Sequence, residues 1–314
     1  MTKELLTKVV VGGVVLCGVC ASSFAADRTT DTAAANAMSA VVVSSINESM
    51  HGDHAKDWMK RTNVGVTFQH HWKPQYHIET VQPLGHFDER SKHLIFTQDR
   101  ISNESDFGTT LNVGLGYRVL NESETRLVGI NAFYDYGFKH HHARIGGGVE
   151  YFTGQNEFRA NVYKGVSGEK EIDATNHIFE KVVDGYDVGY ATTFKNARWA
   201  RAYIEGYHWD FKHHDDQNGF KVGAELQVTP NISVDAGYNK STHHSGDAYG
   251  KIMYTLSKTD FALFGGKHSD DSVSTVRSKM LDKVRRNNNI VVERYQKDAP
   301  TVQSDTVTFS VRVR

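Results

Sequence analysis

The chain has 314 residues, with 36 lysines and arginines against 37 aspartates and glutamates, so its formal net charge is −1. This balance leaves no basic footprint for nucleic acid, and a nucleic-acid partner is excluded. The two cysteines, Cys17 and Cys20, both lie in the N-terminal segment that we expect to be removed. A disulfide scaffold, a thiolate metal site and a cysteine nucleophile are therefore excluded from the mature chain.

The first 25 residues have the layout of a secretory signal peptide. Lys3 and Lys8 precede an apolar run at residues 9–20, and Ser23 and Ala25 suit the −3 and −1 positions of a cleavage site. The apolar run is too short to span a bilayer. We therefore expect an exported protein that is cut after Ala25.

Residues 26–61 form a second, largely polar segment. Apolar side chains recur in it at helical spacing, at Ala35, Met38, Val42, Ile46 and Met50. The pattern predicts a periplasmic helix or an ordered linker.

Residues 62–258 repeat one pattern, about ten residues of alternating apolar and polar character followed by a turn. In one copy Leu111, Val113 and Leu115 alternate with Asn112 and Gly114. Such alternation predicts strands with one apolar and one polar face. Twelve strands are expected, at residues 64–70, 76–84, 94–101, 111–120, 127–138, 143–152, 158–166, 185–194, 199–211, 220–228, 232–240 and 249–256.

A soluble periplasmic sandwich and a membrane barrel both show this alternation. The polar faces decide for the barrel, because they carry charged groups that are costly to bury in a dry core and that a water-containing lumen would accommodate. The predicted lumen groups are Asp135, Arg144, Glu150, Arg159, Arg201, Glu205 and Glu225. The fold class expected is an all-β membrane barrel of about 12 antiparallel strands in the outer membrane of a Gram-negative cell.

The connections between the predicted strands alternate in length. Tight turns at residues 121–125, 154–156, 195–197 and 229–231 are expected to face the periplasm. Longer, polar connections at residues 71–75, 103–108, 139–142, 167–184, 212–218 and 241–248 are expected to face outward.

After the last strand, residues 259–296 read as a linker. Val276, Met280, Leu281 and Val284 recur at helical spacing within residues 272–286, which are too charged for lipid. Two placements remain open: a solvated helix outside the barrel, or a helix threaded through the lumen, which a barrel of this size could hold.

An ordered set of motifs resembles the inverse autotransporters, the family of the intimin and invasin adhesins. The motifs are RNNNIVVE at residues 286–293, LNVGLGYR at 111–118, GINAFYDY at 129–136, RIGGGVE at 144–150, ANVY at 160–163, DGYD at 184–187 and VTP at 228–230. The resemblance covers about residues 63–295.

The resemblance implies a twelve-stranded translocator whose linker passes through the pore and presents a C-terminal passenger for cell adhesion and virulence. The implied pore residues are Leu281, Asp282, Val284, Arg285, Arg286, Asn287, Asn288, Asn289 and Ile290. Some of the lumen acids are expected to pair with Lys283, Arg285 or Arg286. The implied partners are outer-membrane lipid and lipopolysaccharide, the barrel-assembly machinery, periplasmic chaperones and a host-cell receptor.

The chain departs from the family pattern after the linker. Only residues 297–314 follow, whereas one immunoglobulin-like domain needs on the order of 100 residues. We therefore expect a short surface-exposed tail on an adhesin-type barrel. The alternative is a barrel without a passenger that acts as a channel or a structural protein.

Histidines cluster in or beside the predicted outward connections, at His70–His71, His140–His142, His213–His214 and His243–His244. Imidazole is a common metal ligand and gains a proton near pH 6.5, so the hypothesis is a surface patch that binds Zn²⁺ or senses acid. The alternative is a composition bias in unconstrained loops.

No enzyme activity and no cofactor are expected. The run His213-His214-Asp215-Asp216 superficially resembles the His/Asp pairs of outer-membrane proteases, but sequence adjacency does not supply a catalytic geometry. The sequence also contains no Gly-x-Ser-x-Gly elbow, P-loop, HExxH motif or EF-hand loop.

Overall fold

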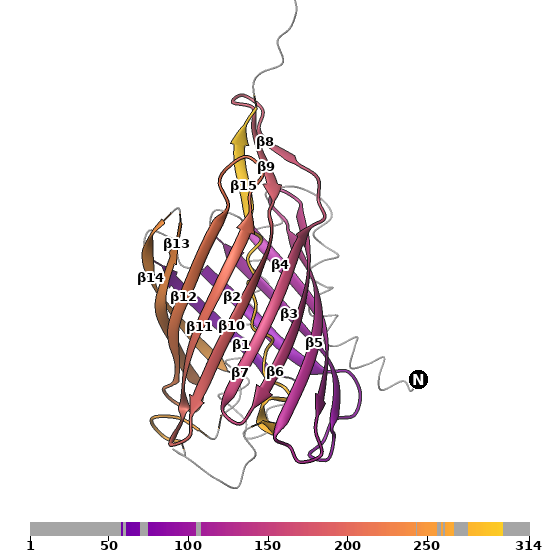
Figure 1. The fold of residues 1–314 in the computed structure, drawn as a ribbon, viewed down its shortest axis with the longest axis vertical. Coiled ribbons are helices and arrows are strands. Elements are labelled where there is room, and N and C mark those ends of the chain that lie inside the picture. The colour runs from indigo at the N-terminus through magenta and orange to yellow at the C-terminus, as the bar shows by residue number, and fades with distance from the viewer. Residues whose placement is uncertain are drawn as a thin grey trace, which may run out of the picture.

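The structure is a computed structural model that describes residues 58, 61–69, 75–104, 108–242, 244–255, 259, 261–266 and 276–297. Twelve of its strands close into an antiparallel barrel (Figure 1). The strands are β1 (Thr62–Gln69), β2 (Gln75–Pro83), β3 (His93–Glu104), β4 (Gly108–Leu120), β5 (Arg126–Gly137), β6 (His142–Thr153), β7 (Asn156–Gly165), β10 (Asp184–Phe194), β11 (Ala197–Asp210), β12 (Gln217–Gln227), β13 (Ile232–Ser241) and β14 (His244–Thr255). The predicted fold class and strand number are confirmed.

Neighbours in the chain are neighbours in the barrel, except that β7 pairs with β10. The barrel closes where β1 pairs with β14, from Asn63 opposite Thr255 to Gln69 opposite Tyr249. Closure leaves no open sheet edge, which a bilayer would not tolerate.

Between β7 and β10 the chain forms a structure that the sequence analysis missed. Residues 167–184 were expected to be a loop, but they contain β8 (Lys170–Asp173) and β9 (Ile178–Val182). Together with β15 (Val292–Gln296) these strands form a separate three-stranded sheet beyond one end of the barrel (Figure 1).

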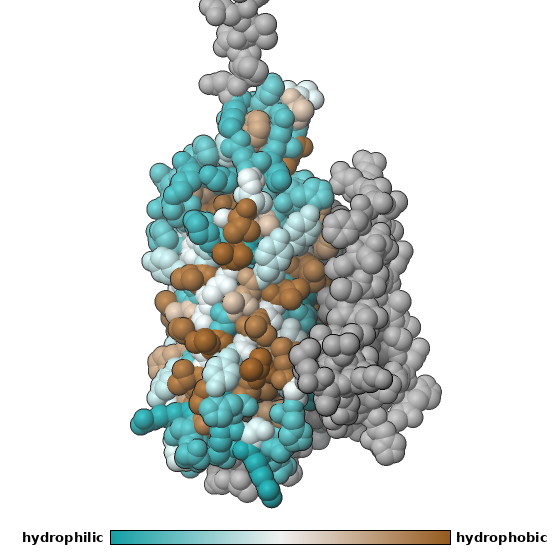
Figure 2. Space-filling view, turned by 90° about the vertical axis from the view of Figure 1, so that its right-hand side faces the viewer, coloured by the Kyte–Doolittle hydropathy of each residue, from teal (hydrophilic) through white to brown (hydrophobic). Residues whose placement is uncertain are grey.

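Strand β4 shows how the alternation is used. Val113 and Leu115, on its outer face, are 43% and 55% exposed, whereas Asn112 and Arg118, on its inner face, are 1% and 0% exposed. Apolar side chains gather around the middle of the barrel face in Figure 2, and hydrophilic residues gather at its two ends. This is the belt that a hydrocarbon layer requires.

Two inner-face glycines of β4 make room for aromatic rings. A Cβ atom at Gly114 would lie 2.2 Å from the ring of Phe133, and one at Gly116 would lie 2.2 Å from the ring of Phe96. Both rings belong to an apolar cluster inside the barrel. The cluster comprises Val81, Leu94, Phe96, Leu120, Leu127, Phe133, Phe152, Val276, Met280 and Val284.

The predicted helix at residues 272–286 is wrong for its described part, residues 276–286. A single 3₁₀ turn, η2 (Arg277–Lys279), is followed by chain without regular secondary structure. The apolar spacing reflects contact with the barrel interior instead, because Val276, Met280 and Val284 are all at most 2% exposed.

Other expectations lie outside the described residues. The signal peptide, the tail after Lys297 and all but Trp58 and Arg61 of the segment 26–61 belong to this group. Within the described residues, no helix is long and apolar enough to cross a membrane.

Candidate functional site: a chain segment inside the barrel

Residues 276–296, here called the pore segment, run through the barrel from one end to the other (Figure 1). At the end with the short turns, Arg277 donates to both carboxylate oxygens of Glu124, at 2.6 and 2.7 Å, and to the carbonyl of Ser91. Hydrogen bonds from Arg277 and from Lys92 hold the pKa of Glu124 at about 2. The segment therefore begins with an ion pair to the turn between β4 and β5.

Arg118 of β4 holds the next part of the segment by its backbone. Its guanidinium is bidentate to Glu150 at 2.8–3.0 Å and donates to the carbonyl of Met280 at 3.0 Å. It also donates to the carbonyls of Lys279 and Asp282. The end of a helical turn leaves carbonyls without partners inside the turn, and Arg118 binds those of Met280 and Asp282. The Lys279 carbonyl also accepts from the backbone N–H of Asp282 at 3.1 Å.

Gln98 of β3 binds the backbone of Val284 in both directions. Its amide oxygen accepts from the Val284 N–H at 2.6 Å, and its amide nitrogen donates to the Val284 carbonyl at 3.1 Å. The same nitrogen donates to Glu79 at 2.9 Å. A strand-like pair of bonds thus fixes the segment at one residue.

A buried charge cluster grips the middle of the segment. Arg286 donates to the two oxygens of Asp135 at 2.8 and 2.6 Å, and Arg144 donates to the same carboxylate at 2.8 Å. Arg144 also donates to the carbonyls of Asn287 and Asn289, at 2.8 and 2.9 Å. The asparagine run is therefore held through its carbonyls.

The basic side chains of the segment each meet an acid of the wall. The ion pairs are Lys279 with Glu157 at 3.0 Å, Lys283 with Glu79 at 3.8 Å, Arg285 with Glu225 at 2.7 Å and Arg286 with Asp135 at 2.6 Å. Charge complementarity of this kind fixes register as well as adding energy.

All seven predicted lumen groups lie in ion pairs. Besides those of Asp135, Arg144 and Glu225, the pairs are Glu150 with Arg118, Arg159 with Glu205, and Arg201 with Glu157. Two of these groups, Asp135 and Arg144, are fully buried. Their charges are compensated by partners rather than by solvent.

Several contact residues were missed, among them Glu79, Gln98, Asn112, Arg118 and Glu157. Their signal was present, because each stands on the polar face of an alternating strand. The polar face alone does not show which of its residues contact another segment: Arg118 is a charged residue in the most regular strand, and Gln98 lies in one of the less regular strands. A neutral amide that binds backbone leaves no charge pattern to detect.

At the other end the segment leaves the barrel as β15, which pairs antiparallel with β9 from Val292 opposite Val182 to Gln296 opposite Ile178. Glu293 accepts hydrogen bonds from the backbone N–H groups of Lys212 and His213, at 2.9 and 3.0 Å. Burial acts to raise the pKa of Glu293, but the bonds from His213 and Lys212 outweigh it and lower that pKa.

The two histidine clusters that the structure describes contact two different glutamates. His140 and His142 contact Glu180, and His213 and His214 lie 2.9 and 4.0 Å from Glu293. His141 pairs instead with the hydroxyl of Tyr136 at 2.7 Å. His70, His71, His243 and the side chain of His244 lie outside the described residues.

Glu180 is the most enclosed of these carboxylates. Burial acts to raise its pKa, but hydrogen bonds from His142, Arg294 and His140 hold that pKa at about 2. Sequence reasoning missed Glu180 because it lies in the segment that was read as a loop.

Residues 19–288 of this chain match the family model of the "Inverse autotransporter, beta-domain". The chain belongs to this family. Two curated relatives of this β-domain are intimin of Escherichia coli O111:H-, 24% identical over 283 residues, and the inverse autotransporter adhesin YeeJ of Escherichia coli strain K12, 25% identical over 227 residues. These alignments cover 80% and 67% of the chain, but only 29% and 9% of the relatives.

A solved structure supports the fold of the inverse autotransporter β-domain. It comes from the work "Unveiling the Mechanism Behind the in-meso Crystallization of Membrane Proteins" and matches with a TM-score of 0.63 and 20% identity. The match covers 75% of this chain and all of that chain. The outer-membrane location expected from the sequence is confirmed by the family.

Proposed function

We propose that this β-domain anchors and exports a C-terminal segment to the cell surface, in the manner of an adhesin. The observation that carries the proposal is the path of the pore segment. It is bound to the turn residue Glu124 at one end of the barrel, and it pairs with β9 beyond the other end. A chain held in this way can only continue away from the barrel on the far side.

The direction of export follows from the lengths of the connections. Glu124 belongs to a short turn, and short turns of outer-membrane barrels face the periplasm. The sheet of β8, β9 and β15 stands at the opposite end, where the longest connection between barrel strands of the described chain, residues 166–183, joins β7 to β10, and long connections face outward. The segment therefore enters from the periplasm and leaves at the cell surface. The expected long connection at residues 241–248 was wrong, because β13 ends at Ser241 and β14 begins at His244.

Anchoring and export, rather than catalysis, are what the family favours for this chain. The partners that we propose are those of an anchored adhesin. They are lipid and lipopolysaccharide around the apolar belt, chaperones and the barrel-assembly machinery during insertion, and a host-cell receptor for whatever follows residue 297. Adhesion and virulence are also proposals for this chain. The chain spans less than a third of the intimin it matches, so the activity of the whole intimin does not pass to it directly.

A second candidate function is a channel or structural barrel without a passenger. It is supported by the inner face of β12, where Lys221 and Glu225 stay partly exposed. Solvent can therefore reach part of the lumen alongside the pore segment.

Protease treatment of intact cells separates the two functions. A peptide tag placed after Arg314 should be digested, because export carries it outside, whereas the same tag inserted in the turn at residues 195–197, at the same end as Glu124, should be protected. Protection of both tags until the outer membrane is permeabilised would contradict export and favour the second candidate.

A further inference from the structure

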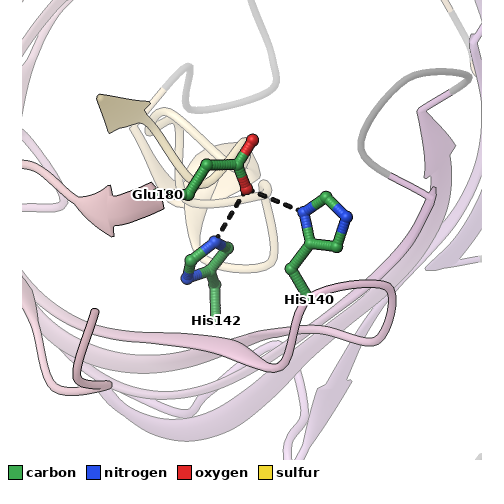
Figure 3. Close-up of side chains that lie close together, drawn as sticks. All are labelled: His140, His142 and Glu180. Carbon is green, nitrogen blue, oxygen red and sulfur yellow. Dashed lines mark hydrogen bonds and ion pairs between the residues drawn. The ribbon is translucent and has the colours of Figure 1, made fainter. Parts of the chain in front are cut away.

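Two histidine side chains, from the β5–β6 turn and the start of β6, converge on one carboxylate oxygen of Glu180 from β9 at the outer rim of the barrel (Figure 3). His140 Nδ1 lies 2.7 Å and His142 Nε2 lies 3.0 Å from Oε2 of Glu180. One ligand atom from each of the three residues lies within 4.8 Å of the others. None of these contacts is needed to hold the pore segment in the lumen.

The convergence has a local cause in the turn between β5 and β6. His141 has a positive φ of 54°, so the backbone reverses there and its ring turns away to Tyr136. The rings on either side of it, His140 and His142, therefore both face β9. Glu180 meets them from β9 with a fully buried side chain.

The donor set is suited to a divalent transition metal. Two imidazoles and one carboxylate are the ligands of many three-residue zinc sites, in which water or an added group fills the fourth position. Bonds of about 2 Å to one ion place neighbouring ligand atoms at most about 4 Å apart. Two of the three separations here already satisfy this limit, so binding requires side-chain adjustment alone.

Arg294 of β15 does not occupy the position that the metal would take. It donates to the other carboxylate oxygen, Oε1, at 3.0 Å. An ionised carboxylate can accept on both oxygens at once, so Oε2 stays available to a metal. Solvent access is also provided, since the side chain of His140 is 21% exposed.

We propose that His140, His142 and Glu180 bind one divalent transition-metal ion, with Zn²⁺ as the probe, at the mouth of the barrel. The ion takes the place of the two hydrogen-bonding protons: each imidazole binds it through the ring nitrogen that faces Glu180 and carries its one N–H on the other ring nitrogen, and a proton leaves to solvent only from a ring that carried two. It ties the β5–β6 turn of the rim to β9, the strand on which the emerging β15 is paired. The site would therefore fasten the surface exit of the chain to the barrel.

Calorimetric titration of the folded barrel, prepared in detergent without a polyhistidine tag, tests this site. We expect His142→Gln either to remove one equivalent of bound Zn²⁺ or to lower the affinity for it by at least about tenfold. A tenfold loss of affinity is the smallest commonly seen even when the altered residue only hydrogen-bonds to a metal ligand. Zn²⁺ that binds to other imidazoles is still bound by the variant, so the titration of the variant is subtracted from that of the unaltered protein. The matched control is His141→Asn, in which asparagine tolerates the positive φ, and it should bind as the unaltered protein does.

A second variant keeps the test valid if His142→Gln fails to fold, as judged by heat-dependent migration on gels. The more exposed His140→Gln should lose the same equivalent. Zn²⁺ should also raise the unfolding temperature of the unaltered barrel and of His141→Asn by more than that of either ligand variant. Unchanged stoichiometry and affinity in a folded His140 or His142 variant would overturn the proposal.

Discussion

The pore segment divides the barrel into two unlike walls. On the packed wall, strands β3–β7, the inner-face residues of β4 such as Asn112 and Arg118 are at most 1% exposed. On the loose wall, strands β12–β14, inner-face residues such as Lys221 and Glu225 remain partly exposed. One face of the lumen is therefore sealed by the segment, and the other keeps contact with solvent.

The two walls should respond differently to mutation. Charges of the packed wall have exchanged water for partners, so the loss of one partner leaves an uncompensated buried charge. Charges of the loose wall can be hydrated when a partner is lost, and partly exposed pairs contribute little. The contacts of the loose wall with the segment are correspondingly few, such as Arg285 with Glu225 and Lys283 Nζ with Met253 Sδ.

The largest effect is expected at Arg118. Arg118→Met leaves Glu150 buried without its bidentate partner and leaves the Met280 carbonyl unbonded, so the free energy of unfolding should fall by about 3–5 kcal/mol. Denaturant titration of the barrel in detergent measures it. The matched double variant Arg118→Met, Glu150→Leu should regain most of the lost free energy of unfolding. If Arg118→Met alone were as stable as the unaltered barrel, the claim that charges of the packed wall depend on their partners would be contradicted.

A smaller effect, on conductance, is expected where the segment crosses the middle of the lumen. Arg285→Ala with Arg286→Ala removes the ion pairs to Glu225 and Asp135, so the segment should loosen and single-channel conductance should rise. Asp135 keeps Arg144 as a partner, so the barrel should remain folded. Conductance and gating identical to those of the unaltered barrel would place the segment elsewhere.

Glu225→Gln tests the loose wall alone. Its side chain is 14% exposed and lies beside Arg285 and Arg201. We expect a loss of about 1 kcal/mol or less, since a glutamine oxygen can still accept from Arg285, whose side chain is 23% exposed. A loss as large as that of Arg118→Met would erase the distinction between the walls.

The smallest effect is the pH dependence at the surface exit. The pKa of Glu293 is lowered in the folded protein, so its contribution is fully present above the unfolded value of about 4.3 and is lost as the pH falls through the lower, folded value. The groups that face it are His213, His214 and the backbone of Lys212. Protease cleavage of β15 should increase only below about pH 4, and Glu293→Gln should reduce this dependence to the part that Glu180 contributes through Arg294.

The sequence was sufficient for the barrel but not for the segment that fills it. The alternation in β4 predicts that Val113 faces lipid and Asn112 faces the lumen, because side chains of a strand alternate with period two. The helical spacing of Val276, Met280 and Val284 led to the wrong prediction of a helix. Arg118 and Gln98 of the barrel wall supply the hydrogen bonds that a helix would make internally. No local pattern reports a backbone partner that lies more than 150 residues away.

The exit sheet escaped prediction for a different reason. β8 and β9 have four and five residues, too few to span a bilayer and too few to show a clear alternation. The other partner of β9, β15, lies more than 100 residues later in the chain. Glu180 and its histidines are therefore brought together only by the tertiary fold.

The most direct test of the threaded path is labelling of single cysteines with a membrane-impermeant maleimide. Gln296 and Ser278 are both exposed, at opposite ends of the pore segment, and Gln296→Cys and Ser278→Cys would be made in a chain without Cys17 and Cys20. On intact cells the account predicts labelling of Gln296→Cys, and labelling of Ser278→Cys only after the outer membrane is permeabilised. Equal labelling of both positions on intact cells, or protection of Gln296→Cys, would contradict it.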